Sequence, residues 1–139
     1  MKQFILNRRI GAAALAFGML ALAGCAALTP ATPEQAVEKR ATAYWKARMA
    51  GEYEKAYALS TPSYRKLYTA VQFRSQFGAG VNVESAEVTK VACEAEKCTA
   101  QLKLGVKPAL LGVKMGTILT YVDDTWLLED GQWWHFQEP

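Results

Sequence analysis

The chain has 139 residues, which is enough for one hydrophobic core and too short for two domains of ordinary size. Its formal net charge is +3, but Lys2, Arg8 and Arg9 account for the whole excess, so the rest of the chain has equal numbers of basic and acidic residues. This balance excludes a basic patch that would attract phosphates or acidic lipids, and we expect no nucleic-acid partner.

The first 24 residues have the layout of a secretory signal peptide. A basic start leads into an uncharged apolar run, residues 10–22, which ends in the small residues Ala23 and Gly24. The run has about 13 residues, whereas a helix that crosses the hydrocarbon core needs about 20. The sequence therefore predicts a cleaved leader and no permanent transmembrane helix.

The segment "LAGC" (22–25) resembles the lipobox of bacterial lipoproteins. The resemblance implies thioether lipidation of Cys25, cleavage before it and acylation of the new amino group, with palmitate as an expected chain. Several acyl chains hold a protein firmly on a membrane, whereas a single chain does so only marginally. The alternative is an ordinary signal peptide in which Cys25 is incidental. Residue 26 is Ala and not Asp, which by resemblance to sorting in Gram-negative cells favours the outer membrane, facing the periplasm, over the inner membrane.

These features divide the chain into three segments. Residues 1–24 are the predicted signal peptide, 25–32 are the lipidated N-terminus with a short linker, and 33–139 form a single α+β domain. The linker "AALTPAT" spans at most about 25 Å when fully extended. We therefore expect the domain to stay close to its membrane.

Helical patterns occupy the first half of the domain. Thr32, Pro33 and Gln35 form a helix-start signal, and apolar residues then recur at helical spacing until Gly51. A second helix is predicted over residues 52–59, and a third helical segment begins at the Thr61-Pro62 signal and continues to residue 77.

Two strands flank a cysteine pair after residue 80. If Cys93 faces Cys98 across a tight loop, Val91 faces Ala100, and the same register pairs Thr89 with Leu102 and Glu87 with Leu104. Export places the pair in an oxidising compartment, so we predict a disulfide. The competing interpretation is a metal site, which would need further ligands, and the only histidine is His135. We expect no metal and no cofactor.

A hairpin closes the domain. Asp130-Gly131 suits a two-residue type I′ turn, which pairs Leu128 with Trp133 and Trp126 with His135. Both faces of this hairpin carry apolar residues, so we predict that it lies in the centre of the sheet and is covered on each side. Helices followed by antiparallel strands predict an α+β fold in which helices cover one face of the sheet.

The order of elements, the segment "GEYEKAYALSTPSYRKLY" (51–68) and the closing pattern W-x-x-x-D-G-x-W (126–133) together resemble the nuclear transport factor 2-like superfamily over residues 33–138. The resemblance implies N-terminal helices packed on a strongly bent sheet as a cone, often with an internal pocket, and frequently a homodimer. The superfamily includes ketosteroid isomerase-like and polyketide cyclase-like enzymes as well as non-catalytic members. No catalytic motif of these enzymes carries over residue by residue.

Asp124 and His135 are the candidate catalytic residues. The hairpin register places them diagonally on one sheet face, where desolvation and pairing would tune both groups for acid–base chemistry. The alternative is that His135 packs on Trp126 while Asp124 sits at a solvated strand end. A pocket lined by Tyr44, Trp126, Trp133 and His135 would serve either an enzyme or a binding protein.

Two functions therefore remain open, and the sequence favours the first. One is a non-enzymatic, membrane-tethered module that binds a small apolar ligand or an envelope protein. The other is a small hydrolase or isomerase that uses Asp124 and His135. The apolar loop at residues 106–117 is either a contact surface for a partner or a connection folded over the pocket mouth.

Overall fold

The computed structural model describes residues 30–77, 81–109 and 115–138. The predicted signal peptide, Cys25, most of the linker and residues 110–114 of the apolar loop lie outside the described residues. Within the described part of the chain, no helix is long and apolar enough to span a membrane.

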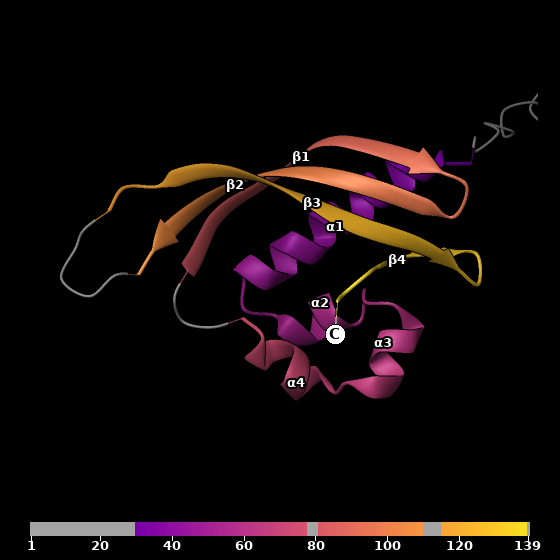
Figure 1. Ribbon diagram of the computed structural model, residues 1–139, viewed down its shortest axis with the longest axis horizontal. Helices are drawn as coiled ribbons and strands as arrows, with labels where there is room; N and C mark the ends of the chain where they lie inside the picture. Colours follow the sequence, from indigo (N-terminus) through magenta and orange to yellow (C-terminus); the bar gives the residue numbers. More distant parts are fainter. Residues whose placement is uncertain (1–29, 78–80, 110–114, 139) are drawn as a thin grey trace, which may run out of the picture. The chain divides into compact units, whose positions relative to one another are not determined.

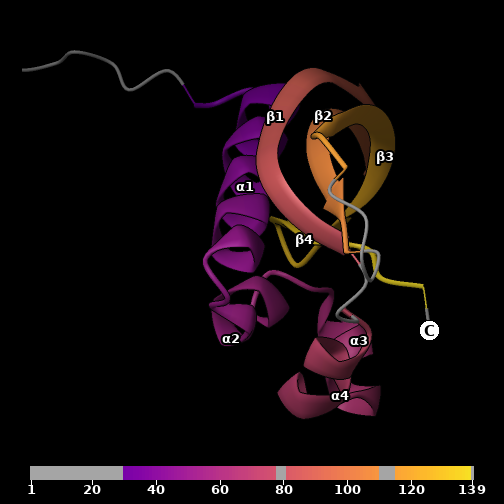
Figure 2. The same cartoon turned by 90° about the vertical axis from the view of Figure 1, so that its left-hand side faces the viewer.

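Helices come first and strands follow, as predicted for an α+β domain. The helices are α1 (Pro33–Met49), α2 (Tyr53–Tyr57), α3 (Pro62–Leu67) and α4 (Ala70–Ser75). The strands β1 (Val81–Glu94), β2 (Lys97–Pro108), β3 (Ile118–Glu129) and β4 (Gln132–His135) form one antiparallel sheet in the order β1-β2-β3-β4. Figure 2 shows that the first three strands are strongly curved and that α1 runs alongside β1.

The predicted start of α1 is present in detail. The Thr32 side chain accepts a hydrogen bond from the Gln35 backbone at 3.3 Å, and the Gln35 side chain accepts one from the Thr32 backbone at 3.1 Å. These bonds satisfy two backbone donors that would otherwise have no partner in the first turn. After the helix ends, Gly51 has a positive φ of 73°, which glycine adopts without a steric cost.

The third helical segment is two helices, so the prediction of one continuous segment is wrong. Tyr68 is extended, with φ −124° and ψ 140°, and Thr69 begins a new helix. Thr69 and Gln72 form a second capping box, which satisfies the first turn of α4. The Tyr68 carbonyl is turned aside to accept a 2.6 Å hydrogen bond from the Tyr57 hydroxyl.

The β1–β2 register follows the prediction only near the turn. Cys93 lies opposite Cys98 and Val91 opposite Ala100. A register shift between Val88 and Lys90 then places Val88 opposite Leu102, and Ala86 comes to lie opposite Leu104. The predicted partners Thr89 and Glu87 are therefore wrong, because one additional residue in β1 turns them to the exposed side and brings apolar side chains to the core.

The final hairpin has the predicted register but not the predicted position. Trp126 pairs with His135 and Leu128 with Trp133, yet β4 stands at the end of the sheet order and not in its centre. A backbone segment covers its outer edge. The amide of His135 donates to the Leu59 carbonyl at 2.8 Å, and its carbonyl accepts from the Thr61 amide at 3.1 Å. This short parallel pairing satisfies backbone N–H and C=O groups of β4. At an open edge these groups could pair with a strand of another chain.

One core lies between the helices and the sheet (Figure 1). Large aromatic side chains dominate it, because a small domain buries the most apolar area per residue with rings. Its largest fully buried apolar side chains are those of Trp126, Tyr44, Phe73, Leu102 and Val37.

Candidate functional site

The structure brings the predicted pair Asp124 and His135 together. Asp124 lies on β3 opposite Ala100 of β2, and His135 ends β4. The Nε2 atom of His135 is 3.6 Å from Oδ2 of Asp124, and the two side chains are 8% and 12% exposed, respectively. The diagonal placement predicted from the hairpin turn is therefore correct.

Asp124 is not a solvated residue at a strand end, contrary to one expectation from the sequence. It lies well inside β3, and its Oδ2 accepts a 2.6 Å hydrogen bond from the indole nitrogen of Trp45 on α1. Trp45 itself is only 6% exposed. A hydrogen bond between a charged acceptor and a buried donor contributes more to stability than a contact at the surface. Asp124 therefore stabilises the packing of α1 on the sheet.

The imidazole of His135 is enclosed by aromatic rings. The Tyr44 ring stacks on it with centroids 4.1 Å apart, and the Trp126 ring meets it edge-on at 5.4 Å. Burial raises the pKa of the Tyr44 phenol well above its usual range. These contacts leave only 7% of His135 exposed.

Three buried polar atoms of His135 and of the two residues paired with it have no hydrogen-bond partner among the described residues. They are Nδ1 of His135, Oγ of Ser60 and Nε1 of Trp126. Ser60 and Trp126 flank His135 from its two neighbouring backbone segments. Groups of this kind are the usual partners of an internal water.

The residues predicted to line a pocket are core residues. Tyr44 and Trp126 are fully buried, while Trp133 and His135 are each 7% exposed. A small pocket lies elsewhere, at the C-terminal end of α1 and the start of β1, with a volume of about 130 Å³. It is lined by Trp45, Arg48, Met49, Gly51, Tyr53, Asn82 and Val83. Sequence reasoning missed this site, since its residues come from segments whose packing no local pattern reveals.

Arg48 is the charged residue of this pocket. Its guanidinium carbon lies 3.8 Å from the centre of the Phe77 ring and 4.5 Å from that of Trp45. Within the described ranges, no carboxylate oxygen lies within 4.0 Å of it. No group of three or more potential metal ligands occurs in those ranges either.

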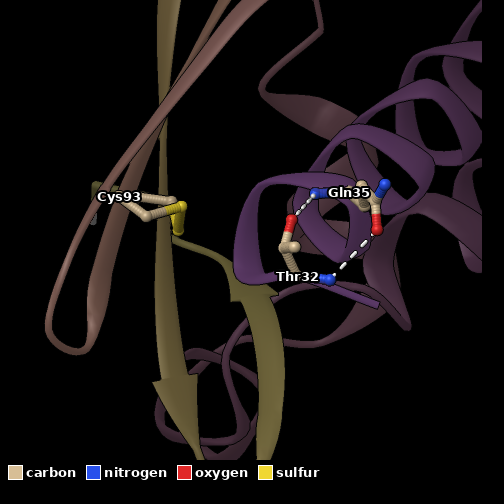
Figure 3. The surroundings of a disulfide bond; sticks show 4 residues. Thr32, Gln35 and Cys93 are labelled. Carbon is tan, nitrogen blue, oxygen red and sulfur yellow. Dashed lines mark hydrogen bonds between the residues drawn. A yellow bond between two sulfur atoms is a disulfide. The ribbon is translucent and has the colours of Figure 1, made fainter. Parts of the chain in front are cut away.

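The cysteine pair forms the disulfide that the sequence predicts. Cys93 and Cys98 are bonded, with their Cα atoms 4.0 Å apart. Figures 1 and 3 show this end of the β1–β2 hairpin beside the first turn of α1, where Thr32 and Gln35 cap the helix. The bond therefore closes the hairpin near the point where the linker enters the domain.

The sequence matches no protein-family profile and no curated protein. Among solved structures, the fold is similar to the solution structure of a SEC-C motif containing protein from Rhodopseudomonas palustris, with a TM-score of 0.52. The likeness has 13% sequence identity and covers 76% of this chain and 75% of that chain. At this identity the likeness concerns the fold alone. The class of protein shown is an α+β domain with a four-stranded antiparallel sheet.

Proposed function

We propose that this protein is a membrane-tethered lipoprotein whose α+β domain is a non-enzymatic binding module of the cell envelope. The "LAGC" segment supports the tether, through Cys25 and at the periplasmic face of the outer membrane. The binding function is supported by the pocket at Arg48. There the guanidinium lies beside Trp45 and Met49, and no carboxylate of the described residues pairs with it. The packed surroundings of His135 favour binding over catalysis, because the imidazole is enclosed by rings.

The tether is tested by metabolic labelling with a clickable fatty acid, followed by separation of inner and outer membranes. Wild type should be labelled and should sediment with the outer membrane, while Cys25→Ser should carry no label and remain an uncleaved precursor. The double variant Cys93→Ser/Cys98→Ser is the matched control, and its label should equal that of wild type. Equal label on wild type and Cys25→Ser would show that the cysteine is not the anchor.

The finer fold that we propose is the nuclear transport factor 2-like cone. The order of helices before strands, the strong strand curvature in Figure 2 and the closing Asp130-Gly131 hairpin support it. A homodimer is part of this proposal. Sedimentation equilibrium of the purified lipoprotein in detergent, corrected for bound detergent, should give twice the mass of one chain, and a single-chain mass would refute the dimer.

A small isomerase or hydrolase is the second candidate, and one observation favours it. His135 and Asp124 approach to 3.6 Å in a site with little exposure, which is the geometry that a general acid–base pair requires. If the pair is catalytic, Asp124→Asn and His135→Gln should both fold with melting temperatures near that of wild type and should both fail to complement a deletion strain. If the pair is structural, both should melt at lower temperature, and complementation should follow stability.

A further inference from the structure

The Arg48 guanidinium is held in the pocket by aromatic faces and not by charge. The Phe77 and Trp45 rings lie 3.8 and 4.5 Å from its carbon, so cation–π contact covers the flat surface of the group. The N–H donors of a guanidinium point outward in its plane. With no carboxylate within 4.0 Å in the described ranges, the positive charge of Arg48 is not neutralised by the protein.

A second arginine, Arg74, contacts the same pair of stacked rings. Phe77 stacks on Tyr53 with centroids 5.7 Å apart and planes at 12°. Arg74 lies over Tyr53 at 5.6 Å, but it does not belong to the pocket lining. The two arginines therefore share one kind of environment, and only Arg48 faces the cavity.

The other walls of the pocket combine polar and apolar surface. The Trp45 ring, the Met49 side chain and Val83 provide apolar surface, while Asn82 adds one amide at the β1 side. The pocket has a volume of about 130 Å³. This is below the usual range for drug-sized ligands, so only a short molecule, or one end of a longer one, fits.

We propose that this pocket binds a small carboxylate that carries a short apolar stem. The fork of the guanidinium matches the two oxygens of a carboxylate, and such charge-assisted pairs are stronger than neutral hydrogen bonds. The stem lies against Trp45 and Met49, which removes apolar surface from water. This inference rests on the proposed binding function and gives its ligand a chemical class.

The test is a ligand-observed NMR titration of butyrate against the full lipidated protein in detergent, with butyramide as the neutral molecule of the same shape. Butyrate should show saturable binding, and butyramide should bind at least about tenfold more weakly, as expected for the loss of a charge-assisted hydrogen bond. Arg48→Gln should weaken butyrate binding by about the same factor. The control Arg74→Gln should change it by less than about twofold, since Arg74 stacks on Tyr53 outside the cavity.

Three outcomes would overturn the proposal: no saturable binding of butyrate, equal binding of butyrate and butyramide, or equal losses in the two arginine variants. If Arg48→Gln does not fold, Arg48→Lys replaces it in the test. Lysine keeps the positive charge but lacks the paired N–H groups of the guanidinium, so its affinity for butyrate should be partly reduced. The comparison of butyrate with butyramide needs no variant at all.

The same protein preparation separates this proposal from the wider one. Butyrate could fail to bind while mass spectrometry finds another small molecule on the membrane-extracted wild type that is absent from Arg48→Gln. That result would support the binding module and refute the assignment of a carboxylate ligand. If neither is found and Cys25→Ser remains labelled, the proposed function itself is refuted.

Discussion

Removing the Asp124 carboxylate should destabilise the domain strongly, although one interpretation of the sequence places Asp124 at a solvated strand end. Its Oδ2 accepts the indole N–H of Trp45 at 2.6 Å, and only 12% of the side chain is exposed. In Asp124→Ala the buried indole N–H of Trp45 loses its partner. The same change removes the side-chain hydrogen bond between α1 and the middle of β3.

The expected cost follows from the nature of the bond. A hydrogen bond to a charged group contributes about 1.5–3 kcal/mol, and a buried donor without a partner costs about 1–3 kcal/mol. We therefore expect Asp124→Ala to lower the free energy of unfolding by about 2–3 kcal/mol. Asp124→Asn keeps an acceptor oxygen and loses only the charge, so its cost should be about 1 kcal/mol.

A double-mutant cycle isolates the bond. Trp45→Phe removes the donor, Asp124→Ala removes the acceptor, and the double variant lacks both. Guanidinium unfolding followed by far-UV circular dichroism should give a coupling energy of about 1–2 kcal/mol, as expected for residues in direct contact. Additive losses within about 0.5 kcal/mol, or an Asp124→Ala protein as stable as wild type, would refute the role assigned to this bond.

Three further predictions concern single features of the fold. Reduction of Cys93–Cys98, which closes a loop with a sequence separation of 5, should lower the free energy of unfolding by no more than about 2 kcal/mol, measured by thermal unfolding with and without a reductant. Free thiols in the mature protein would contradict the bond. Burial raises the pKa of Tyr44 in the folded protein, so as the pH rises the phenol ionises first in the unfolded chain. The contribution of Tyr44 to the free energy of unfolding is therefore complete below about pH 10 and falls by up to about 1.4 kcal/mol per pH unit above it. Tyr44→Phe should remove that part of the alkaline loss in denaturant titrations at pH 9 to 11. Gly131→Ala should cost about 1 kcal/mol in urea unfolding, since φ is +74° there and nothing within 4 Å would meet the added Cβ, and an unchanged midpoint would contradict this.

Features that depend on neighbouring residues were predictable from the sequence. The capping box at Thr32 and Gln35, the Asp130-Gly131 turn and the opposed cysteines each follow from chemistry within six residues. The turn then fixed the register of the hairpin, and with it the meeting of Asp124 and His135. The break before α4 carried the same kind of signal, because the spacing of Thr69 and Gln72 repeats that of the first box.

Features that depend on distant segments were not predictable in the same way. The donor to Asp124 lies 79 residues away in sequence, and no local pattern selects Trp45 over other aromatic residues. The register shift at Val88 arises because the helices need an apolar strand face, and this need overrides the simple alternation counted from the cysteines. The pairing that covers the outer edge of β4 is likewise distant in sequence, since Ser60 pairs with His135.

Trp45 connects the two sites, and this affects how variants of Asp124 should be interpreted. Its indole nitrogen bonds the Asp124 carboxylate while its ring lines the pocket and supports Arg48. A change at Asp124 therefore affects two places. It weakens or removes the hydrogen bond that holds Trp45 in the pocket wall, and it removes the carboxylate next to His135. A loss of function in Asp124→Asn is expected from a binding module as well as from an enzyme. His135→Gln separates the two, since His135 does not line the pocket: in a binding module it should keep butyrate affinity while lowering stability, and in an enzyme it should abolish turnover in a protein that still folds.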